Sequence, residues 1–197
     1  MANCDKVITR DLQANCDNNL LPDLENLAII LNRDDIDFDS SAYGTRTNVL
    51  EDIALKATKT GYYVHQIGDS FSGVGSAMEI KRFRNTFANT FPFVIFDNDP
   101  EIKDVIDGIA NGRFVVVFEN KYKNSLKAGT PGDSTFEVMG WERGLKATKV
   151  ESLKYDADTA GAWVIELKEE GAPRPPLTFY NTSEATTRAA FAALVTV

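Results

Sequence analysis

The sequence FPFVIFDNDPEIKDVIDGIANGRFVVVFEN, residues 91–120, decides the fold because it predicts a strand, a capped helix and a second strand in succession. Phe91–Phe96 is aromatic and β-branched, which is typical of a strand. Asp97–Pro100 then offers N-cap side chains and a proline suited to a first helical turn. Four apolar residues recur at helical spacing and predict a helix over about 100–111: Ile102, Val105, Ile106 and Ile109.

The end of this helix is marked by Gly112, which we expect to adopt a left-handed conformation. Arg113–Glu119 follows as an apolar strand. On its own, this strand–helix–strand unit is also compatible with one crossover of a parallel sheet.

Most of the remaining chain consists of short strand candidates separated by turns. Met78–Thr90 is predicted to be one charged strand, and Thr135–Trp141 and Leu145–Val150 to be paired through a tight hairpin at Glu142–Gly144. Asn181–Ser183 is predicted to cap a C-terminal helix over about 183–195. Because strands outnumber helices, the expected fold is mainly β (α+β), an antiparallel β-sandwich or barrel with a mid-chain and a C-terminal helix. A parallel α/β sheet ranks second.

The net negative charge is concentrated in the N-terminal part of the chain. Of the net charge of −8 over 197 residues, −6 falls on residues 1–41. We therefore expect an acidic N-terminal arm over 1–26 and one β-rich domain over 27–197. A chain with this charge and no basic groove is a poor binder of duplex nucleic acid through its backbone.

The sequence gives no sign of export or of a membrane span. No apolar window of about 18 residues occurs, and no apolar core follows a basic start. Synthesis in the cytoplasm is the expectation. Cys4 and Cys16 lack the spacing of a zinc pair and are expected to be free thiols, with a disulfide as the less favoured alternative.

Candidate catalytic and metal-binding patterns are weak throughout, so no cofactor, no metal and no enzymatic activity are expected. His65 is the only histidine, and no nucleophile elbow accompanies it. The acids at 35, 37 and 39 resemble the start of a calcium loop, but the required glycine and final acid are replaced by Ser40 and Arg46. The loop Gly68–Ser76 is rich in glycine but lacks the Gly-Lys-Ser/Thr of a phosphate-binding loop.

Residues that could contact a neighbouring subunit are those that combine charge or an exposed ring with a flexible setting. The acidic residues would meet basic clusters of another copy. The candidates are Asp35, Asp37, Asp39, Asp69, Phe71, Lys81, Arg82, Arg84, Lys121 and Lys123.

Three segments, ENKYKN (119–124), GTPGDSTFEVMGWERGLKAT (129–148) and YNTSEATTRAAFAAL (180–194), together with the opening MANCDKVITRDLQANCDN, resemble virion structural proteins of tailed phages and prophages of Bacteroides-type bacteria, most of all tail tube proteins. The resemblance covers residues 1–195. It implies a β-sandwich subunit that closes into hexameric rings, which stack into a tube around a lumen that conducts DNA. It also implies other virion proteins as partners, and a place in the virion tail.

Two other kinds of function stay open. Another head–tail or neck component would serve the same particle. A soluble β-sandwich module could instead bind carbohydrate or protein, with Tyr43, Phe71 and Trp141 as exposed aromatic platforms; a hydrolase ranks third.

Overall fold

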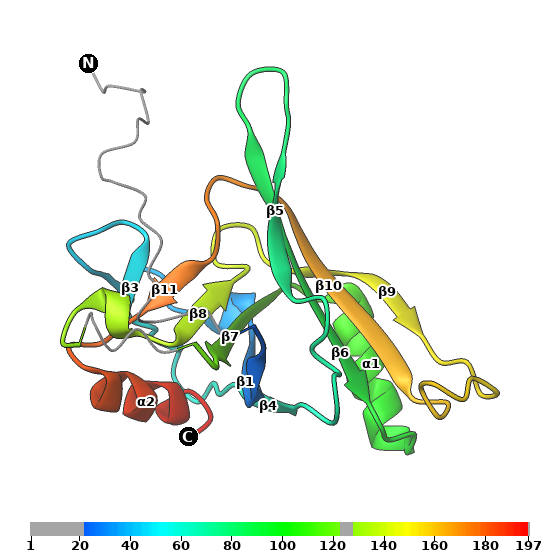
Figure 1. Ribbon diagram of the computed structural model, residues 1–197. Helices are drawn as coiled ribbons and strands as arrows, with labels where there is room; N and C mark the ends of the chain where they lie inside the picture. Colours follow the sequence, from blue (N-terminus) through cyan, green and yellow to red (C-terminus); the bar gives the residue numbers. More distant parts are fainter. Residues whose placement is uncertain (1–21, 123–127, 197) are drawn as a thin grey trace.

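The computed structural model describes residues 22–122 and 128–196, which form two β-sheets and two α-helices (Figure 1). The larger sheet has seven strands in the order β2-β3-β11-β8-β7-β1-β4. These strands are β1 (Leu24–Asn32), β2 (Ala42–Tyr43), β3 (Val49–Asp52), β4 (Tyr62–His65), β7 (Phe114–Asn120), β8 (Phe136–Met139) and β11 (Leu177–Phe179). The smaller sheet runs β5-β6-β10-β9, with β5 (Gly75–Glu79), β6 (Thr86–Ile95), β9 (Lys146–Glu151) and β10 (Trp163–Ala172). The helices are α1 (Pro100–Asn111) and α2 (Glu184–Ala193).

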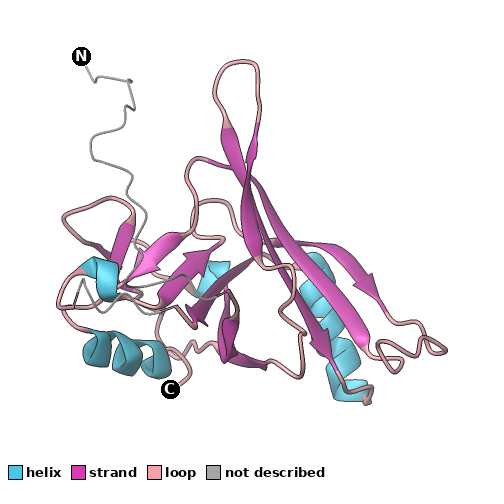
Figure 2. Ribbon diagram, in the orientation of Figure 1, coloured by secondary structure: helices cyan, strands magenta, loops and turns pink. Residues whose placement is uncertain are grey.

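The central strands of the larger sheet are buried on both faces. Along β1, Ala28 and Ile30 belong to the core shared with the smaller sheet and α1, whereas Ile29 and Leu31 belong to the core on the side of α2. Side chains alternate between the faces of a strand, so the continuous apolar run of β7 supplies both cores in the same way. The result is three layers, with α1 and α2 at opposite ends of the molecule (Figure 2).

The expected fold class is confirmed: the chain is mainly β, with one mid-chain and one C-terminal helix. The parallel alternative fails because β6 and β7, which flank α1, lie in different sheets. In the described part of the chain, β3 and β11 form the one parallel pair among the named strands. The N-terminal boundary also differs, since β1 begins at Leu24, inside the segment expected to be an arm.

The hairpin predicted at Glu142–Gly144 is wrong, because β8 and β9 belong to different sheets. The chain instead crosses over, and the buried carboxylate of Glu169 fixes the crossing. It accepts hydrogen bonds from the backbone N–H of Gly140 (3.2 Å) and of Arg143 (2.7 Å), and from Asn89 Nδ2 (2.9 Å). A buried carboxylate needs such donors, so the crossing loop and the smaller sheet are held together at this point.

The single strand predicted over Met78–Thr90 is also wrong. The segment turns at 80–85 and forms the antiparallel pair β5 and β6, in which Gly75 lies opposite Thr90 and Glu79 opposite Thr86. β6 continues past Thr90 without β5 as a neighbour, and there it contains Pro92. A proline is tolerated at that position because no strand on that side requires its missing N–H.

Helix α1 begins as predicted, with the Asp99 side chain accepting a hydrogen bond from the Ile102 N–H (2.7 Å). Its end differs, because Gly112 is extended (φ −85°) rather than left-handed. Glycine is required there for space: a Cβ would lie 2.3 Å from Phe114 Cζ. The predicted apolar stripe is correct for Ile106 and Ile109, which are buried, but Val105 is 52% exposed.

Helix α2 is capped at Ser183, as predicted, by a reciprocal pair of hydrogen bonds with Thr186. Its inner face buries Phe191 and Leu194. Arg188 anchors it to the sheet by ion pairs with the buried Glu119 of β7 and with Glu184 one turn away. These carboxylates raise the pKa of Arg188, chiefly through the hydrogen bonds that Arg188 donates to Glu119.

Candidate functional site: a protruding hairpin and an apolar groove

The β5–β6 hairpin projects beyond the body of the molecule (Figure 1). Its base is fixed by Glu79, whose carboxylate accepts hydrogen bonds from the Gly171 N–H of β10 (3.0 Å) and from Thr86 Oγ1 (3.1 Å), and pairs with Lys81 (3.6 Å). Burial alone would raise the pKa of Glu79, but these three partners together lower it. The hairpin is therefore attached to the smaller sheet in a defined direction.

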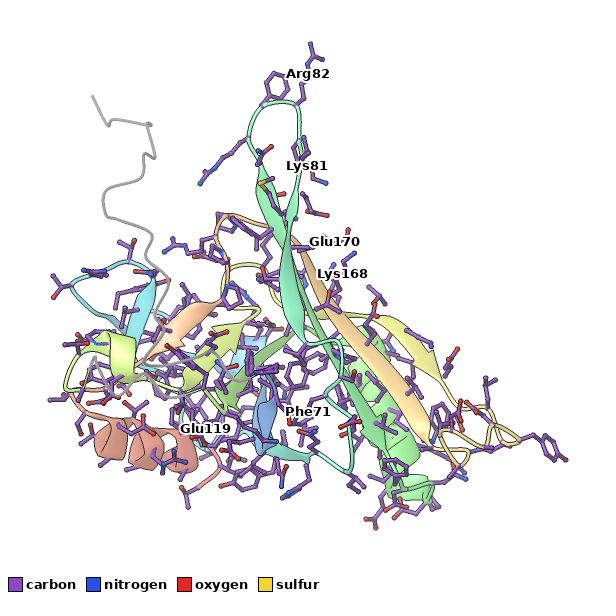
Figure 3. The ribbon with its side chains drawn as sticks, in the orientation of Figure 1. Phe71, Lys81, Arg82, Glu119, Lys168 and Glu170 are labelled. Carbon is purple, nitrogen blue, oxygen red and sulfur yellow. The ribbon has the colours of Figure 1, made fainter. Side chains whose placement is uncertain are left out.

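The tip of this hairpin, Met78 together with residues 80–84, combines large apolar side chains with positive charge. Phe83 is 91% exposed, Ile80 81% and Met78 57%. Lys81 and Arg82 lie at the tip, as Figure 3 shows, and Arg84 follows in the same turn. Exposed apolar residues that gather in this way commonly mark an interaction surface.

A second apolar surface is a groove of about 540 Å³ between β4, the end of β6 and α1. Core residues form its floor, among them Ile30, Phe93 and Phe114. Its walls carry large apolar side chains that the protomer leaves exposed: Tyr62, Tyr63, Ile67, Phe96 and Val105. The groove is open for two reasons. β4 is an edge strand of its sheet, and β5 pairs with β6 only as far as Thr90, so the last residues of β6 have no neighbour on that side.

Helical spacing places two acidic residues of α1 beside this groove, although neither is among the residues that line it. Glu101 precedes Val105 by four residues, and Asp104 precedes Gly108 by four, so each acid shares a side of the helix with a residue that lines the groove. Both acids are among the solvent-accessible residues of α1. Among the described residues that line the groove, none is a lysine or an arginine.

The acidic candidates after β1 serve a local turn. Asp37 accepts hydrogen bonds from the backbone N–H of Ser40 (3.1 Å) and Asp39 (3.2 Å), and from Ser40 Oγ (2.7 Å). The bond from the Ser40 hydroxyl is the main cause of a lowered pKa at Asp37. Asp35 is paired with Lys59 (3.1 Å) and accepts from Asn32 Nδ2 (3.0 Å), which lowers its pKa.

The other candidates are dispersed rather than gathered in one patch. Phe71 is buried against Phe91, with ring centroids 5.2 Å apart, so it offers no free ring; Figure 3 shows it inside the body. Asp69 is exposed in the adjoining turn. Lys121 forms an ion pair with Asp23, and its hydrogen bond lowers the pKa of that acid.

Two further expectations fall outside the described residues. Lys123 lies in the segment 123–127, and most of the expected arm lies in 1–21. Of the basic candidates, the structure brings together those of the hairpin tip, Lys81, Arg82 and Arg84.

The proposed aromatic platform is wrong for two of its three residues. Trp141 is buried, stacks edge-on against Phe38 at 4.9 Å and donates a hydrogen bond from Nε1 to the Tyr43 hydroxyl (2.7 Å). Phe71 belongs to the core, so only Tyr43 is exposed. His65 is exposed on the edge strand β4 with its ring near Tyr63. Within the described ranges, no three His, Cys, Asp or Glu side chains are grouped to hold a metal ion.

Sequence reasoning missed the groove and the exposed tip. The groove residues come from five separate segments, so no local pattern unites them. The tip was hidden by its own pattern, because Met78 and Ile80 alternate as in a half-buried strand. The turn signal that could have revealed it is weak, since residues 80–85 contain neither Gly nor Pro.

Comparison with known proteins returns no match: no family model, no curated protein and no solved structure is significantly similar to this chain. Among the described residues, neither helix has the length and apolar content that crossing a membrane requires.

Proposed function

We propose that this protein is a non-enzymatic, self-assembling virion structural protein, most like a tail tube subunit of tailed phages. Its copies would form hexameric rings that stack around a lumen for DNA, with other virion proteins as partners. The observation that carries self-assembly is the hairpin tip, where three large apolar side chains are exposed on a rigidly attached projection. The mainly β fold with a flanking helix and the resemblance of residues 119–124, 129–148 and 180–194 support the particular family.

Energetics favour association through this tip. Burying apolar surface yields roughly 25 cal/mol per Å², and aromatic anchors dominate many interfaces. The tip residues Ile80 and Phe83 add nothing to the protomer's core, so their burial would be gained entirely on association. A contact between two different surfaces of identical subunits gives rings if it closes and filaments if it does not.

The test is the assembly state of the full chain, measured by light scattering after size exclusion and by negative-stain electron microscopy. We expect rings or tubes from the natural sequence. The double variant Ile80→Ser/Phe83→Ser should stay monomeric while its far-UV spectrum and Tm are unchanged.

The matched control is Tyr155→Ser, which removes a fully exposed aromatic side chain that lies outside the hairpin. It should assemble like the natural chain. A natural chain that stays monomeric up to the highest soluble concentration would overturn self-assembly, and open filaments without rings would overturn the tail tube assignment.

A further inference from the structure

The apolar side chains of the hairpin tip are not buried by the described residues of the same protomer. Figure 1 shows the tip projecting away from β4 and α1, the elements that border the groove. Its hydrogen bonds also stay local, as in the contact of Lys81 N–H with Asn85 Oδ1 (3.3 Å), and Arg82 packs over the adjacent Phe83 ring. No described residue of the protomer covers Ile80 and Phe83, which leaves both side chains free to contact another molecule.

The groove is the matching surface on the body. Apolar tip residues need an acceptor whose own apolar side chains are exposed, and the groove leaves Tyr62, Ile67 and Val105 each more than half exposed. A volume of about 540 Å³ is in the range that accommodates compact apolar groups.

The charges of the two surfaces are opposite. The tip carries Lys81, Arg82 and Arg84, and of these Lys81 is neutralised in part by Glu79. On the α1 side, Glu101 and Asp104 flank the residues that line the groove. Such complementarity sets the register of an interface and suppresses wrong pairings.

Two other hollows lined by described residues fit the tip less well. One, of about 520 Å³, is lined by cations that would repel the tip, among them Arg33, Arg113 and Arg143. The other lies beside Asp69, but its large apolar lining residues, Leu24 and Phe71, are already buried in the core.

From these observations we infer that the β5–β6 hairpin tip of one copy docks in the groove between β4, β6 and α1 of a second copy. The inference rests on the proposed self-assembly and names the acceptor surface. Because tip and groove are different surfaces, the contact is head-to-tail, so each copy donates one hairpin and accepts one.

Charge exchange tests the pairing. The tip variant Arg82→Glu/Arg84→Glu and the groove variant Glu101→Lys/Asp104→Lys should each weaken association at least about tenfold, because each places like charges opposite one another. The chain that carries all four substitutions should recover most of the loss. The control Asp107→Lys makes one such acid-to-lysine change on the face of α1 turned away from the groove, and should assemble normally.

Cross-linking tests the geometry directly. In a Cys4→Ser/Cys16→Ser background, a Phe83→Cys copy mixed with a Val105→Cys copy should form a disulfide-linked dimer on oxidation, and a mixture with Tyr155→Cys in place of Val105→Cys should not. No dimer from the first mixture, at concentrations where the background chain assembles, would overturn the docking mode.

The two proposals fail differently. If tip variants abolish assembly while the groove variant and Val105→Lys assemble normally, self-assembly through the hairpin stands and the groove is not its acceptor. If Asp69→Lys abolishes assembly instead, the hollow beside Asp69 is the acceptor and the inference is overturned. If the natural chain is monomeric, both proposals fall.

Discussion

The two ends of the β5–β6 hairpin place similar side chains in opposite environments. Just past the Gly75–Thr90 pair that closes the hairpin, Phe91 is fully buried, with the rings of Phe71 and Phe118 at 5.2 and 5.8 Å. At the tip, Phe83 is 91% exposed and contacts Arg82. The ring of Phe91 therefore stabilises the folded protomer, whereas the ring of Phe83 adds no stability until another surface covers it.

The largest expected effect distinguishes these two rings. Phe91→Ala should lower the free energy of unfolding by about 3–5 kcal/mol, because it removes a buried aromatic ring and leaves a cavity. Phe83→Ala should change it by less than about 0.5 kcal/mol, as exposed substitutions do. Guanidinium unfolding of both variants, under conditions where the protein is monomeric, checks the difference. A large loss of stability from Phe83→Ala would show that the tip is part of the protomer's core after all.

The next effect concerns the anchor of α2, a polar contact inside the body. Glu119 accepts hydrogen bonds from Thr135 Oγ1 (3.0 Å) and from both terminal nitrogens of Arg188. Glu119→Gln should cost about 1.5–3 kcal/mol of unfolding free energy, since it weakens charge-assisted bonds at a buried site. The control Glu184→Gln weakens the more exposed partner of Arg188 and should cost only about 0.3–0.5 kcal/mol. Equal effects in thermal unfolding would mean that burial of Glu119 does not strengthen the contact.

A smaller loss of stability is expected when the N-cap of α1, the helix that borders the groove, is removed. Asp99→Ala removes the N-cap of α1 and should cost about 1 kcal/mol, because the Ile102 N–H loses its acceptor. Hydrogen exchange at the first turn of α1 should accelerate, and association should weaken in parallel, since this turn carries Glu101. Asp99→Ser is the control, because serine also caps helices. Faster hydrogen exchange with unchanged association would show that the first turn of α1 is not part of the docking surface.

The smallest effect is a dependence on pH inside the body. Burial raises the pKa of Glu137 above its usual 4.5, although a hydrogen bond from Asn120 opposes the shift. The folded state then holds this proton more tightly than the unfolded state, so stability falls as pH rises from about 4.5 through the folded-state pKa. Glu137→Gln should therefore stabilise the protein at pH 7, by less than about 1 kcal/mol, and should change little at pH 4. Thermal unfolding at pH 7 and pH 4 measures this difference in stability. An equal change at both pH values would contradict a raised pKa of Glu137.

Local patterns predicted the elements that depend on neighbours in sequence. The helix after Asp99 and the strand 114–120 follow from caps and periodicity close at hand. Partners far along the chain were not predictable in this way. The strand pairs on both sides of Gly140–Gly144 belong to different sheets because Glu169, some 26 residues further on, fixes the crossing.

The candidate site was predicted only in part. The basic residues Lys81, Arg82 and Arg84 were identified by their charge, and the structure places them together at one tip. An apolar pattern shows which side chains avoid water and not which surface covers them, so the predicted strand over Met78–Thr90 gave no sign that Phe83 is exposed. Val105 was assigned to the core stripe of α1 for the same reason, although it faces the groove.

Pro92 affects which kind of contact this part of β6 can make with another molecule. The stretch of β6 beyond Thr90 would otherwise present a row of free backbone donors, the template on which strands of other chains stack into fibrils. A residue without an N–H interrupts that template within FPFVIF, a run of aromatic and β-branched residues. At this edge, side chains rather than free backbone donors therefore meet any neighbouring molecule.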